Sequence, residues 1–165
     1  MSKSKKILGI DPGLARAGYG IVVSSNGNFS AKTYGCIETK KNENTEIRFK
    51  IIYDSITKII LKEKPDEMAI EKLYFAKNVT NALTVSHARG VIMLAAANNN
   101  IPIREFTPLQ IKQALTGYGR AEKKQIQKVI KMILNLKEIP KPDDTADALA
   151  VAVCAHQTKD HSYEK

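Results

Sequence analysis

Residues that form disulfides or bind zinc are scarce in this sequence. It has two cysteines, Cys36 and Cys154, and three histidines, His87, His156 and His161, among 165 residues. The cysteines are too few and too far apart to predict a disulfide framework or a zinc site, so we expect both to be reduced, packed thiols. The histidines lack the spacing of zinc ligands, and we interpret His87 and His156 as packing or helix-surface residues.

Long hydrophobic runs are also missing. The longest apolar stretches are residues 90–97 and 148–155, far short of the roughly 20 residues that cross a bilayer. Basic residues at positions 3–6 resemble the start of a signal peptide, but Asp11 interrupts the apolar run after them and no small-residue cleavage site follows. We therefore expect a cytoplasmic protein that does not associate with membranes.

Acidic residues are outnumbered by basic ones. The chain has 26 Lys and Arg against 17 Asp and Glu, which gives a net charge of +9. This excess favours a polyanionic partner, although many basic proteins simply carry solvated lysines. No internal repeat, low-complexity tract or long linker divides the chain, so we expect one domain over residues 1–165, with flexible ends at 1–5 and 158–165.

The first part of the chain predicts three consecutive antiparallel strands. Three short apolar runs carry this prediction, at residues 6–10, 19–24 and 29–38. Asn26 and Gly27 lie between the second and third runs, and this dipeptide is a strong hairpin signal. We interpret Gly13, Gly18 and Gly20 as turn residues between the first two strands.

Apolar residues then recur at helical spacing. Ile52, Ile56 and Ile60 share one face of a helix predicted over residues 46–64, which Pro65 ends. The pair Thr107-Pro108 is typical of an N-cap and first turn. The other expected elements are strands at 67–71 and 101–106 and helices at 78–98, 109–115, 121–136 and 144–157. This order predicts an α/β domain with a mixed five-stranded sheet flanked by helices, which fits a ribonuclease H-like fold.

Acidic side chains follow two predicted strands and open the last predicted helix. Asp11 and Glu71 each end an apolar strand, where an Asp is also typical of a turn and a Glu of solvated surface. Asp144 and Asp147 share one helix face, although Asp143 or Asp144 could be an N-cap and the helix dipole favours Asp147. Acids so concentrated suit two-metal phosphodiester hydrolysis, in which carboxylates hold two Mg²⁺ ions about 4 Å apart.

Seven short motifs occur in order along the chain. They are Ile7-Leu8-Gly9-Ile10-Asp11-Pro12-Gly13, Gly18-Tyr19-Gly20, Ala69-Ile70-Glu71, Ala76-Lys77-Asn78, Ala88-Arg89-Gly90, Ala121-Glu122-Lys123 and Asp144-Thr145-Ala146-Asp147-Ala148-Leu149-Ala150. Together they resemble the RuvC family of Holliday junction resolvases, from about residue 6 to residue 156. The resemblance implies a ribonuclease H-like fold and a homodimeric, Mg²⁺-dependent endonuclease. Such an enzyme makes paired nicks in strands of like polarity at a four-way DNA junction, in recombination and repair.

The same resemblance implies roles for individual residues. The implied site residues are the catalytic, metal-binding acids Asp11, Glu71, Asp144 and Asp147, the junction-stacking aromatic Tyr74 with its neighbour Phe75, and the basic residues Lys112 and Lys123. Two Mg²⁺ ions per site are expected, and Mn²⁺ also suits oxygen ligands. A branch-migration helicase complex is the implied protein partner.

The charge pattern supports a basic surface independently. Residues 112–131 hold six Lys or Arg and one acid. At helical spacing, Ile126, Val129 and Ile130 lie opposite a basic side made of Arg120, Lys123, Lys124, Lys128 and Lys131. A solvated amphipathic helix is the simpler explanation, but the absence of balancing glutamates favours contact with DNA phosphates. Lys77 is a further DNA-binding candidate.

Other functions share parts of this pattern. One is a nucleotide-binding domain like those of actin, Hsp70 chaperones or sugar kinases, but the chain is short for two lobes and has no second Gly-rich phosphate turn. Others are a related ribonuclease H-fold nuclease and a non-catalytic junction-binding protein. Because two symmetric incisions need two active sites, we predict a two-fold homodimer, with the Ala-rich, weakly charged residues 78–98 as its interface.

Overall fold

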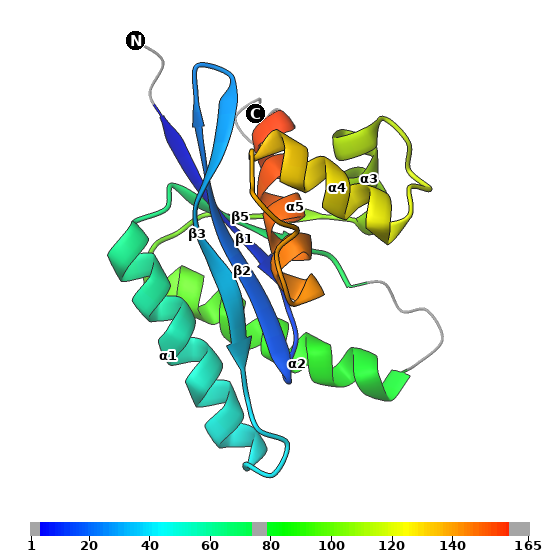
Figure 1. The fold of residues 1–165 in the computed structure, drawn as a ribbon. Helices are drawn as coiled ribbons and strands as arrows, with labels where there is room; N and C mark the ends of the chain where they lie inside the picture. The colour runs from blue at the N-terminus through cyan, green and yellow to red at the C-terminus, as the bar shows by residue number, and fades with distance from the viewer. Residues whose placement is uncertain (1–3, 74–78, 159–165) are drawn as a thin grey trace, which may run out of the picture.

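The computed structural model describes residues 4–73 and 79–158 (Figure 1). The strands of this part of the chain are β1 (Lys5–Asp11), β2 (Arg16–Ser25), β3 (Asn28–Glu38), β4 (Glu67–Glu71) and β5 (Ile103–Phe106). Its helices are α1 (Thr45–Glu63), α2 (Val79–Asn98), α3 (Pro108–Thr116), α4 (Lys123–Ile133) and α5 (Asp143–Gln157). The strand order is β3-β2-β1-β4-β5; β1 to β3 are antiparallel, and β4 and β5 run parallel to β1. The predicted mixed five-stranded sheet is confirmed.

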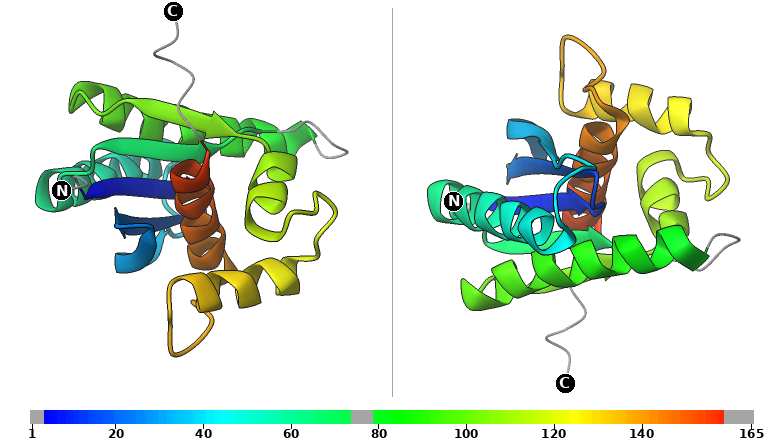
Figure 2. Two further views of the ribbon diagram at one scale, coloured as in Figure 1. Left: turned by 90° about the horizontal axis from the view of Figure 1, so that it is seen from above. Right: turned by 90° about the horizontal axis from the view of Figure 1, so that it is seen from below.

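Helices cover both faces of the sheet (Figure 2). Successive residues of β1 point to opposite faces, so Leu8 and Ile10 pack with α1 and α2 while Ile7 packs with α5. Helices α3 and α4 pack in turn against α5. Each large aliphatic side chain buried in these two cores contributes about 1.5–3 kcal/mol, so the two layers hold the ends of β1, β4 and α5 in fixed positions.

Glycines bring α5 directly onto β1 and β2. A Cβ atom at Gly18 would lie 1.9 Å from the Asp144 carbonyl oxygen, and one at Gly9 would lie 2.1 Å from the Ala148 carbonyl oxygen. The prediction that Gly18 and Gly20 are turn residues was therefore wrong. Both lie within β2, two residues apart and on one face. The absence of a side chain admits the helix backbone at Gly18 and the side chain of Leu149 at Gly20.

Most predicted elements are confirmed, with shifts of one to three residues at their ends. Strand β5 begins at Ile103 because the preceding Pro102 has no N–H, although its carbonyl accepts the Met68 N–H at 2.8 Å. Thr107 caps α3 through a capping box, as predicted. Helix α4 is shorter than predicted, with Glu122 as its N-cap, so Arg120 precedes the helix.

The N-cap of α5 is Pro142, so Asp143 and Asp144 are first-turn residues and neither is the cap. The interpretation of these acids as helix caps was wrong. Their carboxylates are therefore not needed to satisfy the first backbone N–H groups of the helix.

The thiols and the two described histidines lie in the kinds of place that the sequence predicts. Cys154 is buried, Cys36 is half-buried, and both are free. His156 packs against Phe29, and His87, on α2, contacts a neighbouring aromatic ring edge-on. No helix within the described residues is long and apolar enough to span a membrane.

Candidate functional site

Four carboxylates approach one edge of the sheet. Asp11 and Glu71 are the last residues of β1 and β4, which are parallel neighbours, so their side chains leave the sheet at the same edge. Helix α5 begins beside that edge because Gly18 lets the backbone of Asp144 lie against β2. Asp147 follows almost one helical turn later, and all four acidic residues are half-buried.

The carboxylates are close enough to perturb one another. Burial, and then the charges of Asp147, Glu71 and Asp144, raise the pKa of Asp11 from 3.8 to about 8. Burial and the charge of Asp147 raise the pKa of Glu71, and burial raises the pKa of Asp147 itself. A cluster of acids that resists ionisation in this way is stabilised by a nearby cation.

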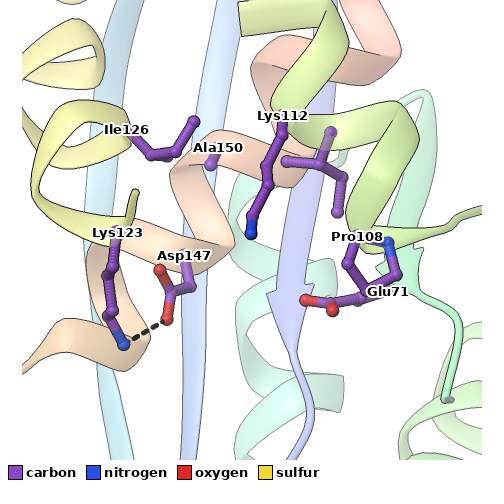
Figure 3. Close-up of a pocket in the computed structure, with 8 residues that line it drawn as sticks. Glu71, Pro108, Lys112, Lys123, Ile126, Asp147 and Ala150 are labelled. Carbon is purple, nitrogen blue, oxygen red and sulfur yellow. Dashed lines mark hydrogen bonds and ion pairs between the residues drawn. The ribbon is translucent and has the colours of Figure 1, made fainter. Parts of the chain in front are cut away.

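A lysine supplies one positive charge to the cluster. The ammonium nitrogen of Lys123, at the start of α4, lies 2.9 Å from Oδ2 of Asp147 (Figure 3). It also lies 3.3 Å from Oδ2 of Asp143. Lys112, on α3, points into the space between Asp147 and Glu71. A pocket of about 230 Å³ is lined by the charged side chains of Glu71, Lys112, Lys123 and Asp147. Its remaining wall is apolar and is formed by Pro108, Ile111, Ile126 and Ala150.

The donor atoms of the cluster fit a hard divalent cation. All four acids offer carboxylate oxygens, the ligands that Mg²⁺ and Mn²⁺ prefer. In the described residues, no group of three His, Cys, Asp or Glu side chains is arranged to hold a metal ion. The carboxylate of Asp147 forms an ion pair with the ammonium group of Lys123. The fit to a divalent cation therefore rests on the carboxylate oxygens and on their mutual repulsion, and not on a preformed metal geometry among the described residues.

Asp11 and Asp144 also border a second groove, which sequence reasoning missed. It has a volume of about 920 Å³ and is lined by Arg16, Lys41 and Arg48 as well as by these two acids. We call it the arginine groove. Its three basic residues come from the start of β2, the β3–α1 loop and α1, so only the folded chain brings them together.

The basic residues predicted for the α4 region differ in their surroundings: most face solvent, and one contacts the acid cluster. Ile126 and Ile130 are buried while Lys124 and Lys128 are exposed, which confirms an amphipathic helix. Arg120, before the helix, is also exposed. Lys123 differs, because its ammonium group turns to the acids. Tyr74, Phe75 and Lys77 lie outside the described residues.

The family model for the crossover junction endodeoxyribonuclease RuvC matches residues 7–156. The chain belongs to the RuvC family. A RuvC protein of Desulforamulus reducens is 52% identical over 151 residues, covering 92% of this chain and 93% of the relative. A RuvC protein of Alkaliphilus metalliredigens is 56% identical over 148 residues, covering 90% of each chain.

Solved structures agree with this RuvC assignment. The structure of Thermus thermophilus RuvC has a TM-score of 0.85 and 30% identity, covering 92% of this chain and 93% of that one. The same protein in complex with a Holliday junction substrate also has a TM-score of 0.85, at 27% identity. The predicted family, ribonuclease H-like fold and nuclease class are confirmed, and the alternative of a nucleotide-binding domain is not supported.

Proposed function

We propose that this RuvC-family chain resolves Holliday junctions, by nicking two strands of like polarity at a four-way DNA junction during recombination and repair. Its catalytic, metal-binding residues are Asp11, Glu71, Asp144 and Asp147. The observation that carries the proposal is the burial of Asp11 among three other carboxylates at one sheet edge, which raises its pKa to about 8. Without a cation this arrangement only destabilises the fold, so it indicates a site built for charge neutralisation.

The cofactor that fits these acids is Mg²⁺, two ions per site, with Mn²⁺ able to substitute. When bound, such ions activate a water molecule and stabilise the leaving oxygen of the phosphodiester. The chain's own contribution is to hold four carboxylates at the sheet edge and two ammonium groups, on Lys112 and Lys123, beside them. The proposed role of these ammonium groups is to bind the phosphate oxygens of the strand being cut.

DNA contacts are assigned to residues on either side of this site. Tyr74, Phe75 and Lys77 follow Glu71 within six residues. An aromatic ring there could stack on a distorted base at the crossover, which is worth about 1–3 kcal/mol per base. The exposed Arg120, Lys124 and Lys128 would contact duplex phosphates.

The enzyme is proposed to act as a two-fold homodimer through α2. Leu83 and Leu94 are 51% and 53% exposed on this helix, and Gly90 lies between them at helical spacing. A Cβ atom at Gly90 would meet nothing within 4 Å in the described residues. A charge-free stripe of this kind is suited to an isologous contact. A single domain, a cytoplasmic location and a branch-migration helicase partner complete the proposal.

The test is a synthetic four-way junction with one labelled strand at a time, incubated with and without Mg²⁺. The proposal predicts nicks at symmetry-related positions in two opposing strands, only with the metal. A mobility shift without nicks at any Mg²⁺ or Mn²⁺ concentration would instead indicate a non-catalytic junction-binding protein.

A further inference from the structure

The acid cluster borders two grooves that differ in construction. Glu71 and Asp147 line the pocket that contains Lys112 and Lys123. Asp11 and Asp144 line the arginine groove. A DNA strand whose scissile phosphate lies at the acids extends in two directions, so both grooves adjoin its path.

The arginine groove is held in shape by a buried threonine. Thr39, which is 8% exposed, donates its hydroxyl to the Leu14 carbonyl oxygen at 2.5 Å and its backbone N–H to the Ala15 carbonyl oxygen at 3.1 Å. Nε of Arg48 donates to the same hydroxyl at 2.8 Å. This bond ties the start of α1 to the β1–β2 turn, so the guanidinium of Arg48 is positioned before any ligand arrives.

The positive charge of the groove is poorly neutralised within the chain. Among the described residues, no carboxylate forms an ion pair with Arg48 or Lys41. Arg16 faces Glu38 at 3.6 Å, but both side chains are more than half exposed, and such pairs contribute little. The three cations line the same groove as Asp11 and Asp144, and they therefore remain available to an anion that enters it.

We propose that the arginine groove binds the sugar-phosphate backbone of the cleaved junction strand, a few nucleotides from the scissile phosphate. Continuity with the acid cluster identifies the ligand, because a strand seated at Asp11 and Asp144 passes along the groove that these two residues line. Arginine suits this role since its planar guanidinium can donate two parallel bonds to one phosphate. This inference rests on the nuclease function proposed above and assigns Arg16, Lys41 and Arg48 as further DNA-binding residues.

The first test is the salt dependence of junction binding by the double variant Arg16→Ala/Lys41→Ala, in buffer without divalent metal. Each lost phosphate contact lowers the slope of log affinity against log salt by about 0.9, so the slope should fall by about 1.8. Lys62→Ala is the matched control, because Lys62 is an exposed lysine on α1 about 21 Å along the helix from Arg48. Its slope should equal that of the wild type.

The second test locates the contact on the DNA. Neutral methylphosphonate linkages replace single phosphates along the cleaved strand, and affinity is measured for wild type and double variant. At one or two positions beyond the scissile phosphate, the neutral linkage should lower the affinity of the wild type severalfold. The affinity of the double variant should not change at these positions. Melting curves verify that the variant, altered only at exposed positions, remains folded.

The two proposals fail in different ways. The proposal for the arginine groove is overturned if the double variant and Lys62→Ala have equal salt slopes and if each methylphosphonate linkage weakens binding equally for the wild type and the double variant. This holds even when the wild type cuts junctions. The proposed nuclease function is overturned if the wild-type protein does not cut junctions with either Mg²⁺ or Mn²⁺. In that case, the salt slopes of the double variant and of Lys62→Ala still decide whether the groove binds DNA.

Discussion

Replacing Asp147 by Asn removes one of the charges that converge on the acid cluster while keeping the shape of the side chain. Among the charged neighbours of Asp11, Asp147 contributes most to the raised pKa of Asp11. The substitution therefore relieves repulsion within the cluster, and it also removes the ion pair with Lys123. We expect Asp147→Asn to fold, to bind junction DNA at least as well as the wild type, and to lose cleavage.

The expected sizes of these effects differ enough to separate them. The Lys123–Asp147 pair is partly exposed, at 52% and 28%, so its loss costs about 0.2–1 kcal/mol, and relief of repulsion offsets this. For a chain of this length, 1 kcal/mol shifts the melting temperature by about 2–4 °C. Loss of a carboxylate ligand that supports metal-assisted catalysis should cost about 3 kcal/mol or more, which is a hundredfold or larger loss of rate.

The assay is single-turnover cleavage at saturating protein over a tenfold range of Mg²⁺ concentration, alongside a melting curve. Asp143→Asn is the matched control, because Asp143 is an exposed residue one turn earlier on the same helix and also faces Lys123. This variant should cut within about threefold of wild type. Asp147 lies beyond the first turn of α5, so a purely structural Asp147 would interact only weakly with the helix dipole. Its substitution would then cost at most about 1 kcal/mol of stability and leave cleavage intact. A folded Asp147→Asn protein that cuts at near wild-type rate would refute its place among the metal ligands.

Three further predictions concern other parts of the molecule. Metal-free Asp11→Asn should melt at a higher temperature than wild type at pH 8, by at least about 2–4 °C. The pKa of Asp11 is raised from 3.8 to about 8, so the folded wild type holds an extra proton between these values and loses stability as pH rises through that window. Melting curves from pH 4 to 9 check this, and an unchanged pH dependence contradicts the burial of Asp11. Tyr74→Ala should cut about 5- to 150-fold more slowly while Tyr74→Phe stays close to wild type, because stacking needs only the ring; an inactive Phe variant would show that the hydroxyl is required. Leu94→Glu should convert the proposed dimer to a monomer in sedimentation, whereas Leu61→Glu, at a leucine of α1 that is exposed to a similar degree, should not; a dimeric Leu94→Glu protein would place the interface elsewhere.

The positions of the acids could be predicted because each signal is local. Asp11 and Glu71 directly follow short apolar runs, and a run that ends in a charged residue predicts the end of a buried strand. Parallel neighbours then bring two such ends to one edge. Asp144 and Asp147 needed only helical spacing.

Features that depend on contacts between distant segments could not be predicted in the same way. Gly18 resembles a turn glycine in sequence, and its role became clear only where the backbone of α5 lies against it. Arg48 lies in the first turn of a helix, and nothing local indicates that its bond to Thr39 holds it in the groove that Asp144 also lines. Likewise, the pairing of Lys123 with Asp147 joins residues 24 positions apart.

Coordinated cutting of two strands tests the central claim most directly. A supercoiled plasmid that extrudes a cruciform contains a four-way junction, and a single nick releases the supercoiling and removes that junction. We predict that the protein with Mg²⁺ produces linear plasmid with little nicked circle, because the proposed dimer would cut both strands while it remains bound. Accumulation of nicked circle without linear product, or equal cutting of a plasmid that lacks the cruciform, would contradict the account.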